Sequence, residues 1–103
     1  MLDIVPEVGD GTAVLRLTGQ LDLVTAPDLV AAVVAVAVEG PADHVTIDLV
    51  GVDLVDSSGL AAFVRSYRLV TARGGTLTVR RSAPHIRKMF SITGVDQVIP
   101  LEG

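Results

Sequence analysis

The chain of 103 residues contains no cysteine and no tryptophan, and its only aromatic residues are one tyrosine and two phenylalanines. The lack of cysteine excludes disulfides, thiol catalysis and cysteine-ligated metal sites, and is compatible with a reducing compartment. Because 50% of the residues are hydrophobic and so few are aromatic, the core must consist mainly of valine, leucine, isoleucine and alanine. This composition is typical of a folded chain, and we expect residues 1–103 to form one domain.

Long hydrophobic runs and targeting segments are also missing. The longest apolar stretch, residues 29–38, is about half as long as a helix that spans a bilayer. Residues 1–7 lack the basic region and the apolar core of a signal peptide. We therefore expect a cytoplasmic protein that does not associate with a membrane.

Basic residues are scarce in the first half of the chain. Residues 1–56 contain ten acidic residues and a single base, Arg16, whereas residues 57–103 contain seven bases and two acids. The net charge of −4 opposes non-specific binding of nucleic acid, and few aromatic side chains lie among the bases to stack on nucleotides. We expect no direct nucleic-acid binding, and we interpret the uneven charge as solvated faces of the domain.

The apolar pattern predicts alternating strands and helices. Strands are expected at residues 2–5, 12–18, 44–50, 76–80 and 97–99, with the first two paired as a hairpin. A first helix is expected after Thr25, which can cap it, and to run through residues 29–38. A third and shorter helix should begin at Pro84 and end at Gly94.

The second predicted helix has the clearest amphipathic pattern. Its apolar stripe recurs at helical spacing, whereas Arg65, Ser66 and Arg68 fall largely on the opposite face. The stripe consists of Leu60, Phe63, Val64, Tyr67 and Val70. The order ββαβαβαβ predicts an α/β fold in which crossover helices connect the strands of a mixed β-sheet.

Two hydroxyls follow a carboxylate at the start of this second helix, in the segment Val-Asp-Ser-Ser-Gly-Leu at residues 55–60. The first turn of a helix has unpaired N–H groups and a partial positive charge, so a phosphate attached there finds hydrogen-bond donors. Ser57 or Ser58 can therefore carry a phosphorylation switch. The commoner role of a serine at this position is to cap the helix, and the local sequence leaves both roles open.

Known catalytic and cofactor motifs are missing. Val55 stands where a serine hydrolase would need the first glycine of its motif around Ser57, and neither a P-loop nor a dinucleotide fingerprint is present. His44 and His85 form no metal-like pair, and we interpret them as surface residues. Asp22 and Asp56 lack a marked substrate pocket. We therefore expect no enzyme activity, no cofactor and no metal.

Three segments together resemble the STAS domain family of bacterial anti-sigma factor antagonists. They are Gly-Gln-Leu-Asp at residues 19–22 with the helix start at 25–26, the motif at 55–60, and the segment from Pro84 to Gly94. The resemblance covers nearly the whole chain. Its most specific part is Asp-Ser-Ser-Gly-Leu at a strand-to-helix junction.

The resemblance implies a phosphorylation-controlled partner switch. In this family the serine directly after the aspartate is phosphorylated, which corresponds to Ser57, and the loop containing Asp22 lies beside it. Asp56, Ser58 and Gly59 then become neighbours of the phosphate that contribute to partner binding, with Ser58 as a cap or support residue. The unphosphorylated protein is expected to bind an anti-sigma factor kinase, which releases its sigma factor. The kinase ends the complex by phosphorylating Ser57 with ATP, and a PP2C-type phosphatase restores it.

Two other functions remain open. The chain can be a STAS interaction module of a larger assembly, such as the tail of an anion transporter or a stress-signalling scaffold, although the retained Ser57 favours the antagonist. The other open function is that of an enzyme or nucleotide-binding protein that uses Asp22 and Asp56. Family members usually continue into a further helix, so we expect the C-terminal helix to be missing and leave the oligomeric state open.

Overall fold

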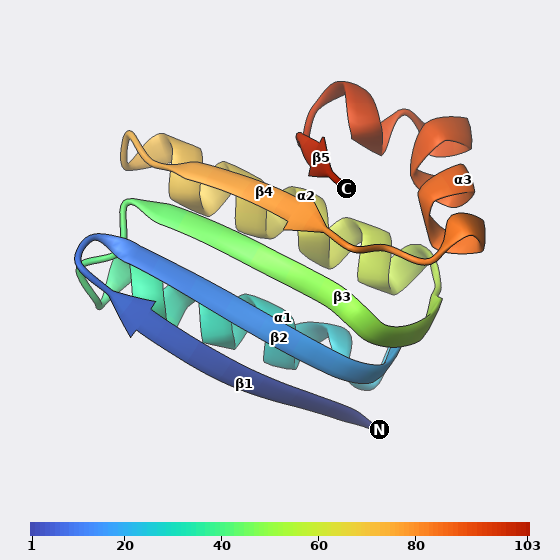
Figure 1. Cartoon of the computed structure of the whole chain (residues 1–103), viewed down its shortest axis with the longest axis horizontal. Helices are drawn as coiled ribbons and strands as arrows, with labels where there is room; N and C mark the ends of the chain where they lie inside the picture. The colour runs from blue at the N-terminus through green and yellow to red at the C-terminus, as the bar shows by residue number, and fades with distance from the viewer.

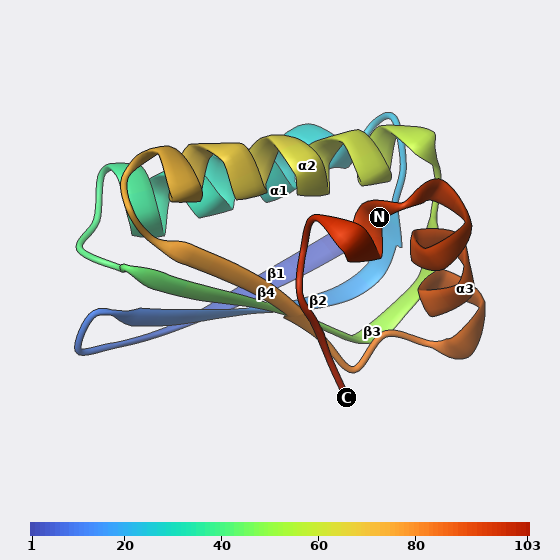
Figure 2. The ribbon, with the colours of Figure 1, turned by 90° about the horizontal axis from the view of Figure 1, so that it is seen from above.

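A five-stranded sheet with helices on one face forms the structure, a computed structural model that describes residues 1–103 (Figures 1 and 2). The strands follow one another in space as they do in sequence. β1 runs antiparallel to β2, and every other neighbouring pair is parallel, so the sheet is mixed as predicted. The strands are β1 (Leu2–Gly9), β2 (Thr12–Leu21), β3 (His44–Val55), β4 (Thr76–Arg80) and β5 (Leu101–Glu102).

The helices occupy the three crossovers and confirm the order ββαβαβαβ. α1 and α2 lie side by side on one face of the sheet, and α3 lies at the sheet's end (Figure 2). The C-terminal end of α1 continues as a short π-helical segment, η1. None of the helices is long and apolar enough to cross a membrane. Their bounds are α1 (Ala26–Val33), η1 (Val34–Val38), α2 (Ser57–Ala72), α3 (Pro84–Thr93) and the 3-10 turn η2 (Val95–Gln97).

β3 continues well beyond the predicted end at residue 50. Its pairing with β2 shifts register twice, between Arg16 and Thr18 and between Gly19 and Gln20, and at each shift β3 contains one extra residue. These irregularities break the alternation of apolar and polar residues, which explains why the sequence pattern stops early. The extension brings β3 to Val55, directly before Asp56, Ser57 and Ser58.

The last strand was predicted at the wrong residues. Gly94 adopts a left-handed conformation, with φ of 81°, and ends α3. The N–H groups of residues 97–99 then bond to carbonyls of Gly94 and Val95, which forms a tight turn in place of a strand and buries Val95 and Ile99. Only at Leu101 does the chain reach the edge of β4, where it pairs with Val79.

The core is aliphatic, as the composition predicts, with one pair of aromatic rings. Phe63 and Phe90 pack edge to face, their ring centroids 5.4 Å apart, and join α2 to α3. The buried stripe of α2 shares only Phe63 and Val70 with the predicted one, and its other members are Gly59, Ala62 and Ser66. Ser66 is therefore fully buried, contrary to the prediction that it lies on the outer face. Small residues face the sheet since they allow α2 to approach it closely.

A buried carboxylate, Asp48, links three strands on the face of the sheet opposite the helices. Its side chain is fully buried and accepts hydrogen bonds from Arg81, from Arg80 at 3.2 Å and from the N–H of Val50 at 3.0 Å. Arg16 on β2 approaches within 3.9 Å. Burial alone would raise the pKa of Asp48, but these hydrogen bonds outweigh burial and lower it. Arg81 adopts a left-handed conformation, with φ of 56°.

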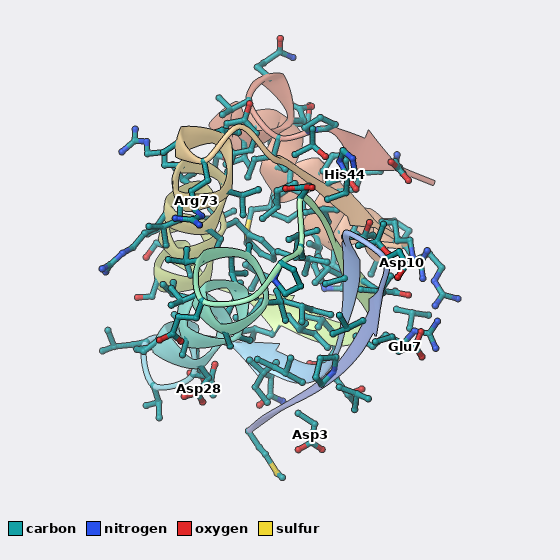
Figure 3. All side chains as sticks on the ribbon, turned by 90° about the vertical axis from the view of Figure 1, so that its left-hand side faces the viewer. Asp3, Glu7, Asp10, Asp28, His44 and Arg73 are labelled. Atoms are coloured by element: carbon teal, nitrogen blue, oxygen red, sulfur yellow. The ribbon has the colours of Figure 1, made fainter.

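Some of the acidic and basic side chains lie on different sides of the molecule. Asp3, Glu7 and Asp10 belong to the hairpin of β1 and β2, whereas Arg73 lies at the end of α2 on another side of the molecule (Figure 3). The Arg73 guanidinium donates a hydrogen bond to the carbonyl of Ala37, at 3.1 Å. A cation at the carbonyl end of a helical segment is favourable, so this arginine joins the ends of η1 and α2.

Candidate phosphorylation and partner-binding site

The two carboxylates singled out in the sequence follow paired residues of neighbouring strands. Leu21 and Val55 pair at the ends of β2 and β3, so Asp22 and Asp56 leave the sheet at the same edge. Neighbouring strands lie about 4.8 Å apart. The Asp56 N–H donates to the Leu21 carbonyl at 3.0 Å, which fixes the two exits relative to each other. The parallel pairing thus places both acids beside the start of α2.

Asp56 caps α2, which corrects the prediction that Ser58 or Ser57 has this role. Its backbone is extended, and its carboxylate accepts a hydrogen bond from the Gly59 N–H at 3.0 Å. Its carbonyl accepts the Leu60 N–H, also at 3.0 Å. As the last extended residue, Asp56 occupies the cap position, and its negative charge suits the positive end of the helix.

The two serine hydroxyls are left free by this arrangement. Ser57 and Ser58 form the first two positions of α2, and neither hydroxyl makes a hydrogen bond. Ser57 is exposed, whereas Ser58 is half-buried and faces the groove between α1 and α2. Of the two, Ser57 is therefore the hydroxyl that an external enzyme reaches more easily.

Gly59 lets the first turn of α2 pack against the ends of β2 and β3. A Cβ atom at this position would lie 2.9 Å from the Leu21 carbonyl oxygen and 2.9 Å from a methyl group of Val55. Neither distance is compatible with an ordinary van der Waals contact. The glycine of the motif is therefore explained by the close approach of the α2 backbone to Leu21 and Val55.

Asp22 organises the turn between β2 and α1. Its carboxylate accepts hydrogen bonds from the N–H groups of Val24 and Thr25, both at 3.0 Å. The Thr25 hydroxyl donates to the Gln20 carbonyl at 2.7 Å and caps no N–H of α1, contrary to prediction. The hydrogen bond from the Thr25 N–H is the main cause that lowers the pKa of Asp22, so this carboxylate is ionised at neutral pH.

The turn presents two apolar side chains that the motif search did not single out. Leu23 is 75% exposed and Val24 is 82% exposed. Beside Leu23, the facing surfaces of α1 and α2 form a largely apolar groove of about 530 Å³. In the sequence, the only sign of the two exposed side chains is an apolar pair inside a polar turn. The groove is lined by Leu23, Ala26, Pro27, Val30, Ala31, Ser58, Ala61, Ala62 and Arg65.

The two histidines take no part in this site, and both are exposed, as predicted. His44 bonds to the Thr76 hydroxyl at 2.7 Å, and His85 bonds to the Asp53 carbonyl at 2.7 Å. His85 joins α3 to β3 three residues before Asp56. The side chains left exposed at this edge are therefore the Ser57 hydroxyl and the apolar Leu23 and Val24.

Comparison with known proteins identifies the fold as that of a STAS domain. The family model described as "Mlab, STAS domain" matches residues 6–101, and the chain belongs to this family. An anti-sigma-B factor antagonist of Bacillus subtilis (strain 168) is 32% identical over 87 residues, which cover 84% of this chain and 78% of that protein.

Solved structures agree with this assignment. The crystal structure of an anti-sigma factor antagonist from Mycobacterium paratuberculosis superposes with a TM-score of 0.85 and 32% identity, covering 98% of this chain and 85% of that one. The Bacillus cell fate determinant SpoIIAA in its phosphorylated form has a TM-score of 0.75, covering 98% of this chain and 92% of that one. At 22% identity, this second likeness concerns the fold.

Proposed function

We propose that this protein is an anti-sigma factor antagonist whose binding to an anti-sigma factor kinase is controlled by phosphorylation of Ser57. The observation that carries the proposal is the free, exposed hydroxyl of Ser57 directly after the Asp56 cap. Relatives named anti-sigma factor antagonists support the role. The unphosphorylated protein binds the kinase, the kinase releases its sigma factor, and the protein thus regulates transcription from the bacterial cytoplasm without being an enzyme.

Phosphorylation ends this complex through charge. The kinase transfers the γ-phosphoryl group of ATP to the Ser57 oxygen, and ADP and the hydroxyl proton leave. The phosphoester carries almost two negative charges and sits one residue from Asp56, beside the turn of Asp22. A PP2C-type phosphatase returns the protein to its binding state when water hydrolyses the ester and inorganic phosphate is released.

The fold tolerates this added charge because the phosphate has no structural contact to replace. Asp56 already satisfies the Gly59 N–H, and Ser57 is exposed at the helix start, where the partial positive charge favours an anion. The neighbouring carboxylates oppose the phosphate. We therefore expect a folded protein with an altered surface, which changes partner binding and leaves the domain intact.

Incubation of the purified protein with its kinase and ATP tests the proposal, with the modified residue located by mass spectrometry. Wild-type protein and Ser58→Ala should each gain one phosphate on Ser57, whereas Ser57→Ala should gain none. Ser57→Ala should keep binding the kinase in the presence of ATP, and Ser57→Asp should bind poorly. A phosphate on Ser58 of the wild-type protein would contradict the assignment.

Capture from the native cell with Ser57→Ala as bait separates this role from that of a module in a larger assembly. An ATP-binding kinase that phosphorylates the wild-type protein on Ser57 supports the antagonist. Membrane transporter subunits recovered without such a kinase would contradict it.

A further inference from the structure

The groove between α1 and α2 is continuous with the Ser57 end of the molecule. The two helices lie side by side over the sheet and begin at the same end, next to the exits of β2 and β3 (Figure 2). Leu23 and Ser58 line the groove at this end. Facing positions further along the groove are alanines on both helices, including Ala31 and Ala61, so the helices leave a hollow between them.

A partner that contacts Ser57 alone would bury too little surface for specific binding. A stable protein interface typically buries about 800 Å² on each side, through about 20–30 residues. Ser57, Asp22, Leu23 and Val24 form only a small part of such a surface. The adjoining groove adds apolar area next to them, as the hydrophobic centre of an interface requires.

The groove has a single charged lining residue, Arg65 on α2. None of the ion pairs in the structure involves it. Arg65 lies seven residues after Ser58, about 10 Å along the helix. An apolar groove with an unpaired cation about 10 Å along the helix from Ser58, the neighbour of the proposed phosphate acceptor, complements a segment that carries apolar side chains and one carboxylate.

We infer that the groove receives an amphipathic segment of the kinase, whose apolar side chains fill the hollow and whose carboxylate pairs with Arg65. This inference rests on the proposed function and extends its interface away from Ser57 along α1 and α2. The groove then supplies part of the affinity, while the phosphorylation state of Ser57 decides whether the complex forms.

Site-specific cross-linking tests the occupant, because the chain has no native cysteine. A benzophenone attached to Ala61→Cys should form a covalent product with the kinase that phosphorylates Ser57. Thr71→Cys, an exposed position of α2 outside the groove, is the matched control and should give little product. A product between two copies of this protein, or equal products from both positions, would overturn the inference.

Charge reversal supplies a second measurement. Arg65→Glu should weaken kinase binding about tenfold, whereas Arg87→Glu, which makes the same charge change on α3, should change it less than about twofold. Urea denaturation of both variants checks that they fold as well as the wild type. If Arg65→Glu and Arg87→Glu bind alike, the predicted carboxylate contact is wrong.

The two proposals fail in different ways. If Ser57 is phosphorylated and Ser57→Asp loses binding, but neither groove experiment gives the expected result, the function stands and the groove inference falls. If no kinase phosphorylates Ser57, the function and the proposed occupant of the groove are both overturned.

Discussion

Replacement of Gly59 by alanine tests how closely α2 packs against the strand ends. The added Cβ would lie 2.9 Å from the Leu21 carbonyl oxygen, about 0.5 Å inside the 3.4 Å at which ordinary contacts begin. Overpacking of this kind costs about 1–3 kcal/mol. Alanine gains about 1 kcal/mol of helix propensity over glycine. The net expectation is a loss of about 1 kcal/mol in the free energy of unfolding, or about 4–8 °C in Tm.

Urea and thermal denaturation followed by circular dichroism measure this loss. Ala61→Gly is the control, since Ala61 is exposed on the same helix and its replacement reports propensity alone, with an expected loss of about 1 kcal/mol. The reasoning is refuted if Gly59→Ala is more stable than the wild type by the amount that Ala61→Gly loses. That result would mean that α2 does not press against Leu21 and Val55.

Three further substitutions test other contacts by urea denaturation. Asp56→Ala should cost about 1 kcal/mol through loss of the helix cap, while Asp56→Asn should cost much less; equal losses would contradict the capping role. Ser66→Ala should leave stability unchanged or raise it by up to about 1 kcal/mol, because the buried Ser66 hydroxyl has no hydrogen-bond partner, and a loss above 1 kcal/mol would contradict this. At neutral pH, Asp48→Asn should lower the free energy of unfolding by about 2 kcal/mol, which is less than is usual for a fully buried ion pair because Arg80 and Arg81 are partly exposed. Because the pKa of Asp48 is lower in the folded protein, its stabilisation is complete above the ordinary value of 3.8 and is lost as the pH falls through the folded-state pKa. The difference between the wild type and Asp48→Asn should therefore shrink below pH 3.8, and a constant difference down to pH 2 would show that the Asp48 charge is not the cause.

The sequence motifs predicted the element order and the place where the functional residues meet. The resemblance to the STAS family placed the Asp22 loop beside Ser57, and the segment at residues 55–60 marked the start of a helix. The identity of the cap could not be predicted, since Asp56, Ser57 and Ser58 are all good caps. The choice depends on which residue is the last extended one.

Other differences have their origin in tertiary packing. Ser66 faces the sheet because small side chains, rather than apolar ones, let α2 lie close to the strands. The strand at 97–99 was displaced because a tight turn buries Val95 and Ile99 before the chain reaches β4. The groove had no signal in the sequence, as it exists only where alanines of two separate helices face each other.

The affinity of the kinase for the two forms of this protein tests the central proposal most directly. Calorimetric titration should compare unphosphorylated protein with protein phosphorylated on Ser57 alone, both checked by circular dichroism and thermal denaturation. We expect phosphorylation to raise Kd at least tenfold, which corresponds to about 1.4 kcal/mol, without loss of the fold. Equal Kd values for the two folded forms would contradict the switch.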